Sequence, residues 1–188
     1  MYEIAIIGAG AAGASAALFT AKAGKKTLLL DSNKSMTARA WLENHYGVEA
    51  IEGPELVATG KKQATKFGAE LKEDTVTNIT GEAGSFVIET ESGTSYEAAN
   101  IIIATGALTN LAESIGIDTK DHREPRFKTA IAVNEDGETT KKGIWAAGAV
   151  AGVSVHTIVT AGDGARVAIN LLSELKGERY VDHDVLKK

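Results

Sequence analysis

The feature that most constrains this sequence is a glycine-rich turn between an apolar strand and an alanine-rich helix. Residues 2–7, YEIAII, form a β-branched run typical of a buried parallel strand. The sequence continues with GAGAAG, which has glycines at 8, 10 and 13, and with ASAALFTAKAG, which predicts a helix ending at Gly24. The next segment, KKTLLLD, predicts a second buried strand ending at Asp31. A strand, a turn, a helix and a strand in this order predict a parallel βαβ unit.

The three glycines of this turn occupy positions where a side chain would obstruct such a unit. Gly8 permits the tight turn, Gly10 lets the backbone approach a pyrophosphate, and Gly13 lets the helix pack close to the strand. The helix N-terminus offers free N–H groups and a partial positive charge to the phosphates. Asp31, 18 residues after Gly13, can accept hydrogen bonds from the ribose hydroxyls of adenosine. The turn therefore predicts a dinucleotide site, and a glycine-rich turn without a ligand is the alternative.

The composition excludes several classes of function. The 188 residues contain no cysteine, which excludes disulfides, cysteine-ligated zinc, iron–sulfur clusters and thiol nucleophiles. The four histidines lack HxH or HxxxH spacing, so no metal site is predicted. The net charge is −5 and the lysines are scattered in pairs, which argues against a surface for nucleic acid or anionic membranes. Because no apolar run approaches the length of a membrane span and the N-terminus enters a strand at once, we expect a cytoplasmic protein without a signal peptide.

The remaining segments predict a single α/β domain over residues 1–188. The stretch 53–71 has an early proline and an apolar stripe, and it predicts a helix that ends before Gly68. The other predicted strands are Val76–Ile79, Ser85–Glu89, Ser95–Ala98, Ile101–Ala104, Ala130–Val133 and Ile144–Ala147. The fold class we expect is α/β, with a Rossmann-like parallel sheet, a three-stranded antiparallel meander and a long C-terminal helix.

Five segments of the sequence resemble the FAD domain of the flavoprotein reductases that bind two dinucleotides, most closely the thioredoxin reductases. These segments are IIGAGAAG, LENHYGVEAIEGPEL, IIIATGA, GIWAAGA and HTIVTAGDGARVAINLL. Each match is modest alone, but together they occur in the order that the family has. The resemblance implies FAD as the cofactor and an oxidoreductase function in which the flavin carries the chemistry.

The resemblance also implies which residues contact FAD. Asn44 and the ATG turn would lie near the flavin and the pyrophosphate, and the strand Thr75–Thr77 would contact adenine through its backbone. His156 would open the long helix, whose N-terminus stabilises negative charge on a reduced flavin. The cofactor-binding set is then Gly8, Gly10, Ala11, Ala12, Gly13, Asp31, Asn44, Val76, Ala104, Thr105, Gly106, Gly148, Ala149, His156, Thr157 and Ile158. Each single residue also has an interpretation without a ligand. Asn44 could be a loop residue, the ATG turn an ordinary strand end, and His156 a helix terminus with no ligand.

Three departures separate this sequence from the thioredoxin reductase pattern. Only residues 107–142 lie where the family inserts an NAD(P)H domain, and they contain no second GxGxxG, so we expect no dedicated nicotinamide site. The redox dithiol is absent, which excludes direct reduction of thioredoxin by this chain. Ala149 stands where the family has an acid after Gly148. In the family, the carboxylate of that acid accepts a hydrogen bond from the ribityl chain. The loop after Asp31 also lacks the family's Gly-Gly-Gln, and we expect its Trp41 to pack under the loop rather than to cover the flavin pocket.

These features favour an FAD-dependent oxidoreductase that takes electrons from a diffusible donor or a partner protein. The catalytic residue is unknown, and His156 and His45 are the only acid–base candidates near the flavin. One alternative is a degenerate reductase that binds FAD or another dinucleotide without turnover, and another is NAD binding in the same fingerprint. The sequence does not name the electron donor or acceptor, and a homodimer is compatible with it.

Overall fold

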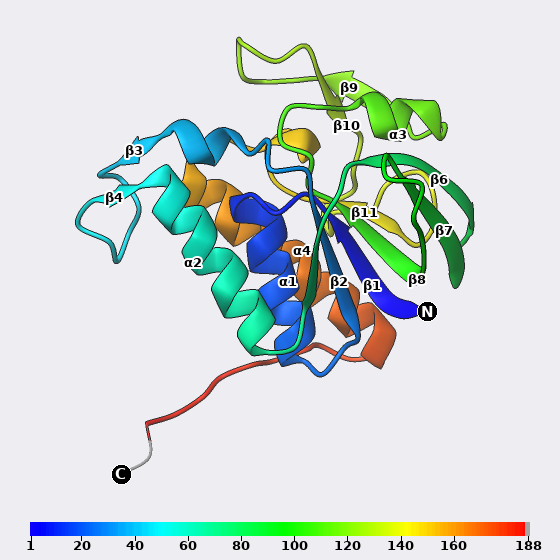
Figure 1. Cartoon of the computed structure of the whole chain (residues 1–188), viewed down its shortest axis with the longest axis horizontal. Helices are drawn as coiled ribbons and strands as arrows, with labels where there is room; N and C mark the ends of the chain where they lie inside the picture. The colour runs from blue at the N-terminus through cyan, green and yellow to red at the C-terminus, as the bar shows by residue number, and fades with distance from the viewer. Residues whose placement is uncertain (187–188) are drawn as a thin grey trace.

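The computed structural model describes residues 1–186 as a central sheet with helices on one face and a smaller β-rich lobe on the other (Figure 1). The strands are β1 Tyr2–Ile7, β2 Thr27–Asp31, β3 Trp41–Leu42, β4 Ile51–Glu52, β5 Glu70–Glu73, β6 Val76–Glu82, β7 Ser85–Thr90, β8 Ser95–Ile103, β9 Thr119–Asp121, β10 Thr129–Ile131 and β11 Ile144–Ala146. The α-helices are α1 Ala11–Lys22, α2 Gly53–Lys66, α3 Asn110–Ser114 and α4 Thr157–Lys176, and short 3₁₀ helices η1 and η2 cover Met36–Arg39 and Ala149–Ala151. The predicted α/β fold class is confirmed.

The main sheet has seven strands in the order β5-β2-β1-β8-β7-β6, and β11 also pairs with β8. Strand β8 joins the parallel and antiparallel parts of this sheet. Its first half pairs antiparallel with β7, whereas its second half pairs parallel with β11, and β1 runs parallel along its other side. Two strands predicted separately, Ser95–Ala98 and Ile101–Ala104, are therefore one continuous strand. The intervening Ala99 and Asn100 remain in the ladder because β1 pairs with this stretch.

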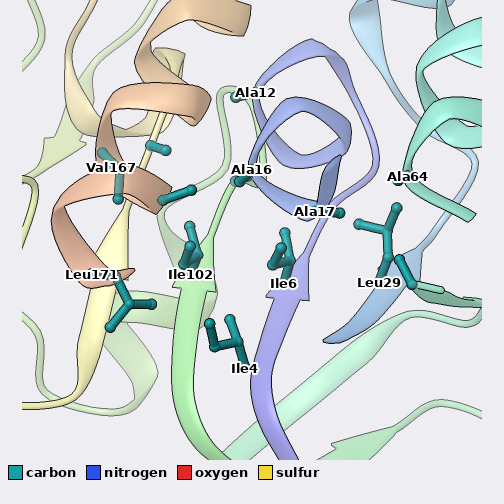
Figure 2. Close-up of a cluster of buried hydrophobic side chains, with 14 of the residues drawn as sticks. Ile4, Ile6, Ala12, Ala16, Ala17, Leu29, Ala64, Ile102, Val167 and Leu171 are labelled. Carbon is teal, nitrogen blue, oxygen red and sulfur yellow. The ribbon is translucent and has the colours of Figure 1, made fainter. Parts of the chain in front are cut away.

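The parallel strands are buried on both faces, which explains their continuous apolar sequence. Ile4 and Ile6 of β1 point towards α1 and α4, together with Ile102 of β8 (Figure 2). Ala5 and Ile7 face the opposite way, into a second cluster with the meander strands. Helices α1 and α4 approach so closely that a Cβ on Gly164 would lie 2.0 Å from the Ala12 carbonyl oxygen, so only glycine fits at this helix crossing.

Several predicted details are corrected by the structure. The polar sequence DTKDHREPRF, residues 118–127, predicts a loop, but it contains β9, which pairs with β10 through backbone groups while its side chains stay largely exposed. The predicted strand Ala130–Val133 instead covers Thr129–Ile131. Trp41 is 63% exposed, so packing under the loop is wrong. The two-residue pairing of β3 with β4 leaves the ring outside, because it is too short to bury both faces. Within residues 1–186, no helix has the length and apolarity needed to cross a membrane.

Candidate functional site

The carboxyl ends of four parallel strands meet at one edge of the sheet. Ile7 of β1 is paired with Leu30 of β2 and with Ile103 of β8, which is itself paired with Ala146 of β11. The predicted glycine turn, Asp31, the ATG turn and the Gly148 turn all follow directly from these strand ends. Open α/β sheets bind their ligands at this edge.

The glycine turn has a geometry that other residues cannot adopt. Gly8 has φ +103° and a Cβ there would lie 2.3 Å from the Ala104 carbonyl oxygen, while a Cβ on Gly13 would lie 1.7 Å from the Gly8 carbonyl oxygen. Gly10 is different, because its φ is −72° and its absent Cβ faces the Ser35 hydroxyl at 2.9 Å. Gly8 and Gly13 are therefore needed for packing, whereas Gly10 keeps the surface of the turn open.

The N-terminus of α1 fits the phosphates of a dinucleotide. Gly10 is the N-cap residue and provides no side-chain cap, and the first intrahelical bond is Ala14 N–H to the Gly10 carbonyl at 2.9 Å. The N–H groups of Ala11 and Ala12 consequently precede the hydrogen-bonded helix and can donate to an anion. The dinucleotide fingerprint thus has both the open backbone and the free donors that a pyrophosphate requires.

Asp31 is buried at the end of β2, with 3% of its surface exposed. Its Oδ1 accepts a hydrogen bond from the Asn33 N–H at 2.9 Å. Its Oδ2 forms an ion pair with the Lys61 ammonium of α2, although the contact lacks the geometry of a hydrogen bond. Lys61 also donates to Asn33 Oδ1 at 3.2 Å. Lys61 was missed by sequence reasoning, because no motif links a lysine on α2 with the acid at the end of β2.

The ATG turn and the predicted adenine strand lie on either side of this edge. Ala104 is buried, the Thr105 hydroxyl donates to the Leu108 carbonyl at 2.7 Å, and Gly106 has φ +71° beside Met36. On the side of β2, the Asp74 N–H donates to the Asp31 carbonyl at 3.0 Å, so the half-buried Val76 follows close to the Asp31 end.

The N-terminus of α4 brings together the two predicted histidines. His156 is the N-cap residue, and Thr157 and Ile158 begin the helix. His45 Nδ1 lies 3.1 Å from the Thr157 hydroxyl, although the two residues are far apart in sequence. Asn44 is exposed beside His45. A pocket of about 130 Å³ between α1 and α2 places His45 beside Gly10 and Ala11. Since pockets that hold a whole drug-sized ligand measure about 300–1,000 Å³, this pocket has room for only one portion of a dinucleotide.

Residue 149 is held by a histidine of the segment that the sequence predicts as a polar loop. Ala149 is buried, and its carbonyl oxygen lies 2.8 Å from His122 Nε2. The Glu124 N–H donates to His122 Nδ1 at 2.9 Å, so Nε2 carries the proton that is donated to Ala149. The Ser154 hydroxyl donates to Glu124 Oε1 at 2.8 Å. Hydrogen bonds from Ser154 and from the Val155 N–H hold the pKa of Glu124 below its ordinary value.

The adjacent Gly148 is fixed by a buried acid on α4. The Gly148 N–H donates to Asp163 Oδ2 at 2.7 Å. Asp163 Oδ1 pairs with the Arg166 guanidinium, with two nitrogens at 2.9 Å. Gly148 has φ +83°, and a Cβ there would meet the Ala12 methyl at 2.6 Å. Asp163 of α4 therefore holds the backbone of the Gly148 turn.

Comparison with known proteins places these features in one family. The family model described as pyridine nucleotide-disulphide oxidoreductase matches residues 2–129. Thioredoxin reductase of Treponema pallidum is 40% identical over 111 residues, covering 56% of this chain and 36% of that protein. Thioredoxin reductase of Rickettsia felis is 37% identical over 109 residues, covering 56% of this chain and 35% of that protein. The chain thus spans about a third of the length of the curated relatives it matches.

Solved structures agree with the fold. A thioredoxin reductase from Gloeobacter violaceus superposes with a TM-score of 0.81 at 17% identity, covering 98% of this chain and 99% of that chain. An oxidoreductase from Agrobacterium tumefaciens gives a TM-score of 0.82 at 17% identity, covering 94% of this chain and 99% of that chain. These identities support the fold alone, whereas the family model covers more than half of the sequence. The chain belongs to the pyridine nucleotide-disulphide oxidoreductase family, as a thioredoxin reductase-like FAD flavoprotein.

Proposed function

We propose that this chain is an FAD-dependent oxidoreductase that takes electrons from a diffusible donor or a partner protein. The observation that supports it most directly is the glycine turn at the end of β1. Gly8 and Gly13 are packed against backbone atoms, whereas Gly10 leaves the turn open beside the uncapped N-terminus of α1. Packing against backbone does not require glycine at position 10, because its φ of −72° suits any residue and a Cβ there would meet only the Ser35 hydroxyl, the end of a flexible side chain.

The residues of the site have distinct tasks in this proposal. Ala11 and Ala12 donate their N–H groups to the pyrophosphate, and Asp31 binds the adenosine ribose. The bound flavin would supply the electron-transfer chemistry. The N-terminus of the 20-residue helix α4 presents its N–H groups and the positive end of its dipole, which would lower the energy of an anionic ligand edge at His156. His156 and His45 remain the candidates for holding a proton there.

The proposed source of electrons rests on what residues 107–142 contain. They form α3, the β9–β10 hairpin and irregular segments, and their sequence has no second dinucleotide fingerprint. We infer that this segment replaces the inserted NAD(P)H domain and that nicotinamide has no dedicated site. Since the chain has no cysteine, any disulfide exchange would need thiols from another molecule.

A second candidate function is favoured by residue 149. Ala149 provides no carboxylate for the ribityl chain, and its backbone is tied to the β9–β10 hairpin through His122. A degenerate module that holds FAD without turnover would have the same features.

An absorption spectrum of the purified protein, followed by anaerobic mixing with donors, tests both functions. Flavin bands are expected in each case. With no site that positions nicotinamide, reduction by NADPH should be slow and should not saturate, whereas a chemical reductant or a protein electron carrier should bleach the flavin quickly. Fast, saturable bleaching at micromolar NADPH would contradict the proposed donor. A protein without flavin bands that also fails to bind added FAD would contradict the proposed function itself.

A further inference from the structure

The ion pair between Asp31 and Lys61 lies where the dinucleotide fingerprint places the adenosine ribose. Asp31 ends β2, beside the glycine turn that ends β1. Lys61 comes from α2, which packs on α1 so closely that a Cβ on Gly60 would lie 3.2 Å from the Ala14 methyl. Because of this helix contact, the next residue, Lys61, lies at the edge of the sheet that is formed by the carboxyl ends of the parallel strands. The ammonium is mostly sheltered, with 18% of the Lys61 side chain exposed, and the carboxylate is almost fully buried.

The hydrogen-bonding capacity of this pair is not exhausted. A carboxylate offers about four acceptor positions and an ammonium offers three N–H donors. Asn33 occupies one position on Asp31 Oδ1, and the Lys61 ammonium contacts Oδ2, which is itself buried. Lys61 directs its donors towards Asp31 and Asn33 Oδ1, which leaves one donor without a recorded partner in residues 1–186. The Asp31 carboxylate therefore keeps unused acceptor positions beside an unused donor of Lys61.

A hydroxyl is the group that matches such a pair, because it donates one hydrogen bond and accepts others. In dinucleotide-binding folds the acid at the end of the second strand bonds the ribose 2′-hydroxyl. An acid alone requires only that the ligand donate, whereas an adjacent ammonium requires that the same oxygen also accept. Lys61 thus adds a second requirement at the 2′ position.

We propose that Asp31 and Lys61 jointly recognise the 2′-hydroxyl of the adenosine ribose, with Asp31 accepting from it and Lys61 donating to it. The inference rests on the proposed dinucleotide function and adds a specificity-determining residue to it. A 2′-deoxyribose leaves both buried groups without their partner. A 2′-phosphate brings negative charge against the buried Asp31 carboxylate, and Lys61 is already neutralised by that carboxylate.

The test compares nucleotides that differ only at the 2′ position. The flavin-free full-length chain is titrated calorimetrically with ADP and with 2′-deoxy-ADP, and then with AMP and with adenosine 2′,5′-bisphosphate. The parent should bind ADP about tenfold more tightly than 2′-deoxy-ADP, since a hydrogen bond to a charged group contributes about that much. It should also bind AMP more tightly than the 2′-phosphorylated nucleotide.

Lys61→Met should reduce the preference for ADP over 2′-deoxy-ADP to about threefold or less. The neighbouring Lys62→Met is the matched control, because Lys62 is exposed and should leave the preference unchanged. A purely structural role for Lys61 would weaken both nucleotides equally and leave their ratio unchanged, which would overturn the proposal. If Lys61→Met does not fold, the parent alone still decides, because equal affinity for ADP and 2′-deoxy-ADP refutes the proposal. A parent that binds neither ADP nor FAD would instead refute the proposed function.

Discussion

Changing Gly13 to alanine should reduce the stability of the fold, whereas changing Gly10 to alanine should reduce FAD binding. Gly13→Ala places a methyl group 1.7 Å from the Gly8 carbonyl oxygen, which is a backbone atom that cannot rotate away. Gly10→Ala meets the Ser35 hydroxyl at 2.9 Å, which is the end of a flexible side chain. Residue 13 should therefore affect folding, whereas residue 10 should affect only binding.

The expected magnitudes follow from these contacts. Overpacking against backbone should cost about 3 kcal/mol, and the better helix propensity of alanine returns up to about 1 kcal/mol. Gly13→Ala should then lose about 2 kcal/mol or more, which lowers the melting temperature by about 4–8 °C for a chain of this size. Gly10→Ala has an allowed φ of −72° and should change stability by less than about 1 kcal/mol. Its methyl group should displace the pyrophosphate from two N–H donors and weaken FAD about 100-fold.

Thermal unfolding of the flavin-free proteins, followed by circular dichroism, measures the first effect. Titration with FAD, followed by flavin fluorescence, measures the second. The argument would be refuted by a Gly13→Ala protein that melts within about 2 °C of the parent. It would equally be refuted by a Gly10→Ala protein that binds FAD as tightly as the parent, since the pyrophosphate would then lie elsewhere.

Two further substitutions test the Gly148 turn. Ala149→Asp should tighten FAD binding about fivefold, because a carboxylate would accept a hydrogen bond from the ribityl chain. The flavin-free variant should have a lower melting temperature, because residue 149 is buried. Equal or weaker FAD binding would mean that Ala149 does not occupy the family's acid position. Asp163→Ala should cost about 3 kcal/mol in the free energy of unfolding, because it leaves the Gly148 N–H and Arg166 without their buried partner. Asp163→Asn keeps an acceptor oxygen and should lose less in a urea titration, and a loss below about 1 kcal/mol for Asp163→Ala would contradict this role.

The parts of the fold that sequence reasoning predicted are those decided by local pattern. The apolar run of β1, the glycine turn and the alanine-rich α1 each carry their own signal, and the structure confirms them as consecutive elements. The C-terminal helix was also predicted, with His156 at its start. The short strands β3, β4 and β9 were missed, because two or three residues with mostly exposed side chains produce no alternation of polar and apolar residues.

The candidate site was predictable only where it depends on one strand end. Asp31 follows from its spacing after Gly13, but its partner Lys61 does not, since the packing of α2 on α1 alone brings them together. The same applies to His45 and Thr157, which meet across most of the chain. Motifs therefore identify the strand ends, while tertiary packing selects the side chains that complete the site.

The alanine at position 149 and the segment 107–142 are linked in the structure. The sequence shows only that the family's acid is alanine, and that residues 107–142 stand where a domain is expected. The structure connects the two, because His122 from this segment donates to the Ala149 carbonyl, and Glu124 accepts from Ser154, which precedes α4. A carboxylate at 149 would position a ligand through its side chain, whereas these contacts position the backbone of the turn itself. The segment therefore supports the turn through its backbone, as Asp163 does from α4. Ala149→Asp would add a side-chain contact for a ligand, whereas Asp163→Ala would loosen the turn that presents it.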